Sequence, residues 1–370
     1  MIRLTKPDFD ENEIESVKRV FDSGWIVQGR EVAHFEEIIA DYCGAENCVV
    51  VSSGHAALHL TYLLMGIGPG DAVFVPSFAW PSAANVAELL GARAVFVDVL
   101  PDTYNIDPND LIKQIEICIA HDWGVPRLLV PVHEFGLMAD MDSIMEIIKK
   151  YDLSIIEDAA CALGASHNGK KVGSYSNMAI LSFHPRKAIT TGEGGAIITN
   201  DPEAAKKLRA WRNHGQLFDN GKRAFVLPGL NYRMTEFQAA IGRVQMAKFP
   251  SILERRKKIV MTYIENLQAV EGIRLPEWDH EHTWQTFMLV LEKHHRDHIV
   301  KRLQEKGIET GPGSVAGHMG KYFQDKYGYK DDDLMVSSLL HRNGLALPLY
   351  PKMNDSDVKK VLDELIQALR

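Results

Sequence analysis

The first two thirds of the chain alternate between short apolar runs and segments in which apolar residues recur at helical spacing. The short runs predict buried strands, and they cover Cys48–Ser52, Ala72–Val75, Ala94–Val97, Leu128–Val132, Leu153–Ile156 and Met178–Phe183. The other segments predict helices over Asp10–Asp22, Ser53–Leu60, Pro108–Ala120, Asp140–Tyr151, Asp201–Asn213 and Thr235–Met246. The first of these helices would present an apolar face at Ile14, Val17 and Val20. Strands that alternate with helices are typical of a mostly parallel sheet covered on both faces, so the pattern predicts an α/β fold.

The last third of the chain has a different order of predicted helices and strands. A long charged helix is expected from about Pro250, followed by a strand over Trp284–Leu291 and helices near Asp297–Lys306 and Asp355–Leu369. We therefore predict two domains, which are a large α/β domain with an amino-terminal arm over residues 1–248 and a smaller α+β domain over residues 249–370.

The composition is that of an ordinary globular protein, with 46% of the 370 residues hydrophobic and 24% charged. The net charge is −8 and the lysines and arginines are scattered, which gives no reason to expect a nucleic-acid partner. The four cysteines show neither paired CxxC spacing nor a matching histidine series, so we expect reduced thiols and no metal. The first residues lack an apolar signal core, and no apolar run approaches the roughly 20 residues that span a bilayer. We expect a cytoplasmic protein without a membrane partner.

One lysine stands where a reactive side chain would be expected. Lys187 follows the predicted strand Met178–Phe183 and precedes the glycine-rich run Gly192–Gly195, and such a run favours a tight loop with exposed backbone. Loss of water there would disfavour the ammonium form, and the neutral amine could form a Schiff base with a carbonyl. The alternative is that Lys187 is one of many surface cations.

A carboxylate and a hydroxyl accompany this lysine. Asp158 comes directly after the apolar run that ends at Ile156, and Ser182 lies five residues before Lys187. Pyridoxal phosphate needs a lysine for its aldehyde and an anion that keeps its ring nitrogen protonated, and Lys187 and Asp158 would supply both. Ser182 could add a hydroxyl to the cofactor phosphate. In the alternative reading, Asp158 caps a helix and Ser182 is an ordinary strand residue.

Small residues follow the predicted strand Cys48–Ser52. The sequence Gly54-His55-Ala56 opens the next helix, and the free N–H groups and positive dipole end of a helix start favour bound phosphate. Trp80, His133, Asp158 and Lys187 all fall just after apolar runs. Since ligands of parallel sheets lie beyond the carboxyl ends of strands, we expect these residues at one edge.

Three segments in this order resemble the DegT/DnrJ/EryC1/StrS family of pyridoxal-phosphate-dependent sugar aminotransferases: EDAACALG, SFHPRKAITTGEGG and NYRMTEFQAAIG. The resemblance covers nearly the whole chain. It implies the fold-type I architecture of aspartate aminotransferase, with Lys187 bonded to the cofactor and Asp158 at its ring nitrogen. It also implies that Trp80 stacks on the ring, unless it is a core residue.

The resemblance further implies a homodimer with shared sites. An asparagine matching Asn231 reaches the cofactor phosphate of the neighbouring subunit, although Asn231 could instead cap the helix that follows. A W-x-x-x-G loop like the one at Trp25 lies near the substrate, with packing of the arm as the alternative.

Three positions depart from the family pattern. His55 replaces a threonine, Cys161 stands where glutamine or histidine often lies near the ring oxygen of the cofactor, and the segment after Gly311 lacks the commoner histidine-and-proline-rich loop. These departures concern the substrate more than the cofactor.

The resemblance predicts an enzyme that moves an amino group from an amino acid, glutamate above all, to a keto sugar linked to a nucleotide, for surface polysaccharide or lipopolysaccharide. A keto sugar without a nucleotide, or a keto cyclitol, is the alternative substrate. A related dehydratase carries histidine in place of Lys187, so the lysine argues against that activity. A catalytically idle regulatory homologue would be expected to have lost at least one of Lys187, Asp158 and Ser182.

Overall fold

The computed structural model describes residues 1–219 and 221–370. Its central sheet is built from two four-stranded groups. The first has the order β3 (Arg93–Val97), β2 (Asp71–Pro76), β4 (Val125–Leu129) and β5 (Ser154–Ile155). The second has the order β6 (Glu157–Asp158), β9 (Met178–Ser182), β10 (Gly195–Thr199) and β1 (Asn47–Val51).

One stretch of chain joins the two groups, because β5 and β6 are separated by a single residue and pair with β4 and β9 respectively. The neighbouring strands are parallel except where β10 pairs with β1 and β9. The predicted α/β fold with a mostly parallel sheet is confirmed.

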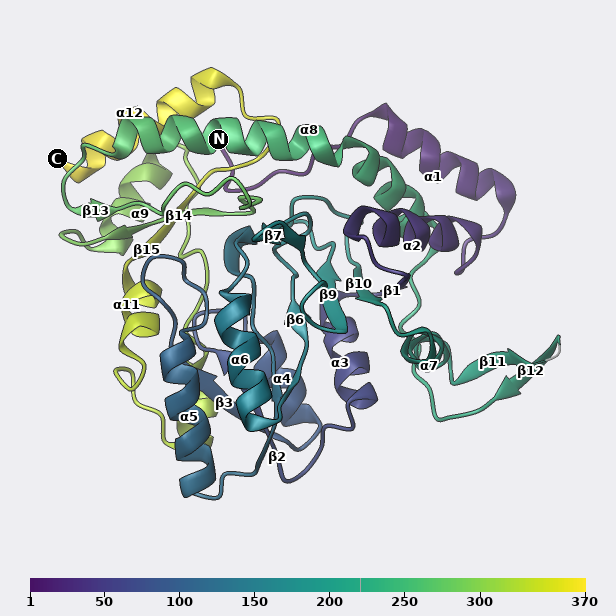
Figure 1. Cartoon of the computed structure of the whole chain (residues 1–370). Coiled ribbons are helices and arrows are strands. Elements are labelled where there is room, and N and C mark those ends of the chain that lie inside the picture. The colour runs from purple at the N-terminus through teal and green to yellow at the C-terminus, as the bar shows by residue number, and fades with distance from the viewer. Residues whose placement is uncertain (220) are drawn as a thin grey trace.

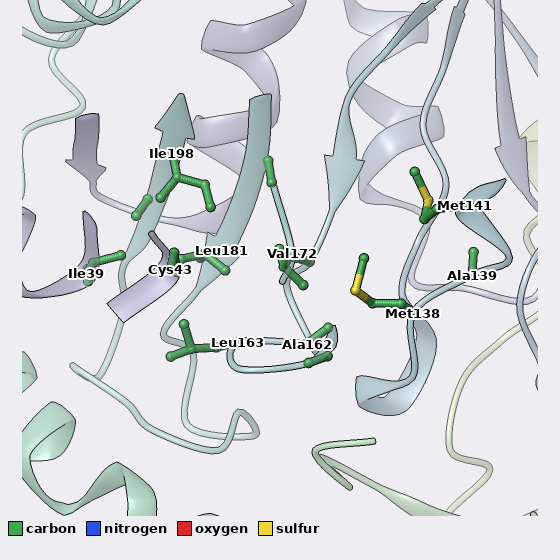
Figure 2. Close-up of a cluster of buried hydrophobic side chains, with 14 of the residues drawn as sticks. Ile39, Cys43, Met138, Ala139, Met141, Ala162, Leu163, Val172, Leu181 and Ile198 are labelled. Carbon is green, nitrogen blue, oxygen red and sulfur yellow. The ribbon is translucent and has the colours of Figure 1, made fainter. Parts of the chain in front are cut away.

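Helices cover both faces of this sheet. One face packs against α3 (Gly54–Leu64), α4 (Ser82–Leu89) and α7 (Pro202–Arg212). The other packs against α2 (Arg30–Cys43), α5 (Pro108–Ala120) and α6 (Met141–Tyr151). Successive strand residues point to opposite faces, so Val50 belongs to one core while Val49 and Val51 belong to the other. Figure 2 shows part of the second core, where Ile39 and Cys43 of α2 face Leu181 and Ile198 of the sheet.

The first helix, α1 (Glu11–Ser23), forms where it was predicted but turns a different face inward. Ile14 is 61% exposed, whereas Glu13, Ser16 and Val20 are buried. The face that includes Glu13 turns inward because the Glu13 carboxylate accepts hydrogen bonds from the Asp10 amide and from the side chain of Gln245. The expectation of an apolar face at Ile14 was therefore wrong.

The longest helix, α8 (Glu236–Leu267), runs through the point where two helices were expected. Pro250 lies inside it, and Phe249 and Ile252 on either side are buried in the same core. Packing on both sides of the proline therefore favours one continuous helix. In Figure 1, α8 crosses from the side of α1 and α2 to the carboxy-terminal sheet, so the predicted boundary after residue 248 falls within a helix.

The carboxy-terminal part is a second, smaller layer. It contains the three strands β13 (Ile273–Arg274), β14 (Phe287–Leu291) and β15 (Gly344–Leu347) and the helices α9 (Arg296–Glu305), α10 (Lys321–Tyr327), α11 (Met335–Asn343) and α12 (Asp355–Leu369). Ile2 of the amino terminus is buried in the same core and bridges Ile308. The predicted strand begins at Phe287 rather than Trp284, since Trp284 has a positive φ of 54°.

The remaining elements are short. They are the hairpins β7 (Ser166–His167) with β8 (Lys170–Lys171) and β11 (Gln216–Asp219) with β12 (Lys222–Phe225), and the 3-10 turns η1 (Glu134–Gly136) and η2 (Gly317–Met319). The hairpin of β11 and β12 projects from the body of the protein (Figure 1). Within residues 1–219 and 221–370, no helix is both long and apolar enough to cross a bilayer.

Candidate active site

Asp158 and Ser182 mark the edge of the sheet at which the candidate site lies. They are the last residues of the parallel strands β6 and β9. His133 follows β4 and donates its backbone amide to the carbonyl of Asp158 at 2.9 Å. The sheet thus brings together strand ends that the sequence places far apart.

The loop that carries Lys187 is closed by hydrogen bonds at its base. The Phe183 amide donates to the Gly194 carbonyl at 2.9 Å, and the Phe183 carbonyl accepts from the Thr190 hydroxyl at 2.7 Å. Gly195 follows directly, and a Cβ there would lie 2.5 Å from the Gly54 nitrogen. Only glycine allows β10 to approach the start of α3 this closely.

The Lys187 side chain lies against Cys161. Its Nζ donates to Cys161 Sγ at 3.0 Å. Burial acts to lower the pKa of Lys187, but Cys161 and the carboxylates of Asp158 and Glu134 outweigh it, so the pKa is raised above its ordinary value. The expectation of a lowered pKa from loss of water alone is therefore wrong, because the neighbours favour the charged form.

Asp158 has the surroundings of a carboxylate prepared for a cationic partner. It is 6% exposed, and one of its oxygens accepts the Ala160 amide at 3.0 Å. Among the described residues its other oxygen has no hydrogen-bond partner. Burial raises the pKa of Asp158, while the Ala160 amide and Lys187 oppose the rise. A buried, half-satisfied carboxylate fits a protonated ring nitrogen.

The start of α3 offers an anion site that differs in detail from the predicted one. Ser53 caps the helix, and its hydroxyl accepts the Ala56 amide at 3.0 Å. The Ala56 amide is therefore occupied by the cap, and the amides of Gly54 and His55 remain as the free donors. A Cβ on Gly54 would lie 3.0 Å from the Cβ of Ser182, so the Ser182 side chain borders the same helix start. This cradle fits a phosphate.

The remaining predicted residues differ in their accessibility. Trp80 follows β2 and is 67% exposed, so its ring is free to stack on a ligand. His133 lies at the predicted edge, but its ring is fully buried, with Nε2 3.1 Å from Glu157 and Nδ1 accepting the Ala139 amide. Both ring nitrogens are occupied, so His133 is a structural residue.

Asn231 does not cap the helix that follows it. Thr235 caps α8 together with Gln238 in a capping box. Asn231 is exposed and pairs through its backbone with Asn213. Its side chain has no hydrogen-bond partner within residues 1–219 and 221–370.

Glu134 is a residue of the candidate site that was not predicted from the sequence. This residue is 5% exposed, and burial raises its pKa to about 7, with Lys187 opposing the rise. It follows the apolar run that ends at Val132, so the same signal that identified Asp158, an acid just beyond a predicted strand, could have found it.

The segment just before β14 contacts the two loops that carry these residues. The amides of Thr283 and Gln285 donate to the carbonyls of Gly136 and Phe135 at 3.0 Å and 2.8 Å. The Gln285 side chain donates to the Arg186 carbonyl at 2.6 Å. One short segment thus fixes both the Glu134 turn and the Lys187 loop.

Comparisons with known proteins identify the family of the chain. The model of the DegT/DnrJ/EryC1/StrS aminotransferase family matches residues 7–366. The chain is 36% identical to GDP-perosamine synthase from Caulobacter vibrioides, over 100% of this chain and 98% of the relative. It is 35% identical to the UDP-4-amino-4-deoxy-L-arabinose–oxoglutarate aminotransferase from Shewanella sediminis, over 97% of this chain and 96% of the relative.

A solved structure of a similar protein has the same fold. The PLP form of Spr1654 from Streptococcus pneumoniae is 26% identical and superposes with a TM-score of 0.92, over 100% of this chain and 98% of that chain. The fold and the site define a fold-type I aminotransferase that depends on pyridoxal phosphate (PLP). The chain belongs to the DegT/DnrJ/EryC1/StrS family.

Proposed function

We propose that this enzyme transfers an amino group from L-glutamate to a nucleotide-linked keto sugar in the synthesis of an amino sugar for surface polysaccharide or lipopolysaccharide. The observation that carries the proposal is the arrangement of Lys187, Asp158 and the α3 helix start at one sheet edge. The names of two full-length relatives, one a GDP-sugar enzyme and one a UDP-sugar aminotransferase, support the substrate class.

The residues divide the work of holding the cofactor. The amides of Gly54 and His55, with the Ser182 hydroxyl, would bind its phosphate, and Asp158 would hold its ring nitrogen. Trp80 would cover one face of the ring, and Cys161 would lie near the ring oxygen. When bound, PLP supplies a carbonyl that carries the amino group and a ring that withdraws electrons from the reacting carbon.

Lys187 would hold the cofactor and also move a proton. Its free amine would accept a proton from the reacting carbon of the substrate, hold it as the ammonium form and release it later in the reaction. Asp158 and Glu134 favour its charged form, which stabilises the lysine after it has accepted the proton. Asp158 keeps a negative charge beside the ring nitrogen, so the ring remains electron-poor.

We also propose a homodimer in which Asn231 completes the neighbouring site. Asn231 is exposed, and Thr235 performs the capping role that was its alternative function. We place the enzyme in the cytoplasm, and its four unpaired cysteines agree with a reducing compartment.

The test is a screen of the purified enzyme with glutamate against keto sugars linked to UDP, GDP and dTDP, followed by the formation of 2-oxoglutarate. Turnover of at least one nucleotide sugar, absent in Lys187→Ala, is the expected result. Turnover confined to free keto sugars or keto cyclitols would replace the nucleotide substrate by that alternative. A colourless protein with no turnover would indicate an idle homologue.

A further inference from the structure

Glu134 is a buried acid that the mechanism above does not use as a binding group. It lies one residue beyond His133, whose amide binds the carbonyl of Asp158. The Glu134 amide donates to Asn105 Oδ1 at 2.9 Å. A Cβ on Gly136 would lie 3.2 Å from the Cys161 carbonyl. Glu134 is therefore fixed beside the residues that surround Lys187.

The neighbouring Phe135 shows that this turn is constrained. Its φ of 56° is unusual for a residue with a side chain. Its carbonyl accepts the Gln285 amide at 2.8 Å, and its ring lies 3.0 Å from where a Cβ of Gly313 would be. Gln285 and Gly313 thus hold the turn from two sides, and an unusual backbone kept in this way is often found at functional sites.

The Glu134 carboxyl has few hydrogen-bond donors. Within the described residues, neither carboxyl oxygen accepts a hydrogen bond, although the nearby Ser314 side chain, itself 5% exposed, acts to lower the pKa of Glu134. A carboxylate offers about four acceptor positions, and leaving them unfilled in a buried place is costly. The carboxyl must therefore bind a proton or receive donors from a ligand.

The charges that face Glu134 come from three elements. Lys187 and Arg186 lie in the loop after β9, Asp158 ends β6, and the Cys161 thiol follows it. Burial raises the pKa of Glu134 to about 7; Lys187 and Arg186 oppose the rise, and Asp158 adds to it. Both protonation states are accessible near neutral pH.

The two substrates of a sugar aminotransferase present opposite chemistry to such a group. The reacting carbon of an amino acid carries a carboxylate, whereas the carbon beside a sugar ketone carries a hydroxyl. Both reacting carbons must approach Lys187. The charge of Glu134 acts on that lysine and raises its pKa. The same carboxyl would therefore meet a carboxylate in one half-reaction and a hydroxyl in the other.

We propose that Glu134 binds both substrates in turn, donating a hydrogen bond from its protonated form to the carboxylate of the amino donor and accepting one, when ionised, from a hydroxyl beside the sugar ketone. This inference rests on the proposed function. It makes Glu134 a specificity-determining residue that changes its protonation between the two half-reactions.

The first test uses glutarate, a dicarboxylate that cannot react, with the PLP-loaded enzyme. Calorimetry in buffers of different ionisation heat between pH 6 and 8.5 measures affinity and proton uptake. In the wild type, affinity should fall about tenfold for each pH unit above 7, with uptake approaching one proton per site. In Glu134→Gln, whose amide donates at every pH, most of that dependence and uptake should vanish.

The second test uses the nucleotide-linked 4-keto-6-deoxyhexose that gives the best turnover, together with its 3-deoxy counterpart. The wild type should prefer the hydroxylated sugar by more than about a hundredfold in kcat/KM, since a buried acceptor left without a donor penalises the analogue. Glu134→Leu should reduce that preference to below about tenfold, whereas Glu134→Gln, which can still accept, should keep most of it.

Equal pH dependence and equal proton uptake in the wild type and Glu134→Gln would overturn the inference, as would a wild type that fails to bind glutarate at any pH. The proposed function fails differently. If glutamate converts the bound cofactor to its amine form but no keto sugar is aminated, the acceptor is wrong, and the glutarate test still decides the role of Glu134. Circular dichroism of both variants confirms that they are folded.

Discussion

Nζ of Lys187 lies 3.0 Å from Sγ of Cys161, a residue 26 positions earlier on a different turn of the sheet edge. The contact fixes where the amine points. Burial acts to lower the pKa of Lys187, but Cys161, followed by Asp158 and Glu134, raises it above its ordinary value. The lysine is therefore positioned by its neighbours and kept charged until a ligand takes its proton.

Replacing Lys187 should abolish transamination. Lys187→Ala removes both the bond to the cofactor and the group that moves the proton, so kcat/KM should fall by at least about a thousandfold. Borohydride reduction of the wild type followed by peptide mapping should find reduced cofactor on Lys187. The matched control, Lys207→Ala on the exposed face of α7, should behave like the wild type. A label on another lysine would refute the assignment.

Asp158→Asn should separate cofactor binding from catalysis. The amide keeps the shape of the side chain but cannot hold the ring proton by charge, so cofactor content should stay near the wild-type value. The half-reaction with glutamate should slow by roughly a hundredfold or more. Stopped-flow absorbance measures this rate, and Asp152→Asn at an exposed helix end serves as control. A near-normal rate in Asp158→Asn would exclude the electron-withdrawing role.

Glu134→Gln should stabilise the cofactor-free protein at neutral pH. The folded-state pKa of Glu134, about 7, lies above the ordinary 4.5, so the folded state binds this proton more tightly than the unfolded chain does. The stability it confers is complete below about pH 4.5 and is lost as the pH rises through about 7. The difference between variant and wild type should grow across that window to at most about 3 kcal/mol.

Thermal unfolding at pH 4.5, 6 and 8 checks this order. The variant should gain most at pH 8 and little at pH 4.5. A gap that is equal at all three pH values would show that Glu134 does not titrate differently in the folded state.

Mixing two inactive variants should restore activity if the sites are shared. In a heterodimer of Lys187→Ala and Asn231→Ala subunits, one site carries both changes and the other carries neither. Random exchange after reversible dissociation should therefore recover up to about a quarter of wild-type activity. Subunit exchange, followed by mass spectrometry of differently labelled chains, is the control. If exchange occurs and no activity returns, Asn231 acts within its own chain.

The residues at the strand ends could be predicted because each follows a local pattern in the sequence. Asp158 and Lys187 follow apolar runs that are visible without any partner. The face of α1 could not be predicted, because Glu13 is buried by Gln245, 232 residues later in the chain. The backbone amide of Ala56 was expected to bind phosphate, but it donates to the Ser53 hydroxyl at 3.0 Å instead. Periodicity identifies which segments are helices, but it does not identify the polar partners that rotate or cap them.

The segment Thr283–Gln285 has a consequence for attempts to change the substrate by exchanging parts between relatives. Its backbone holds the Phe135–Gly136 turn, and the Gln285 side chain holds the Arg186 carbonyl. A chimera joined within α8 would place a foreign segment against both loops and would disturb the position of Lys187. Crossover points placed after residue 286 would retain these contacts. The segment Thr283–Gln285 therefore belongs with the catalytic centre when parts of the chain are exchanged.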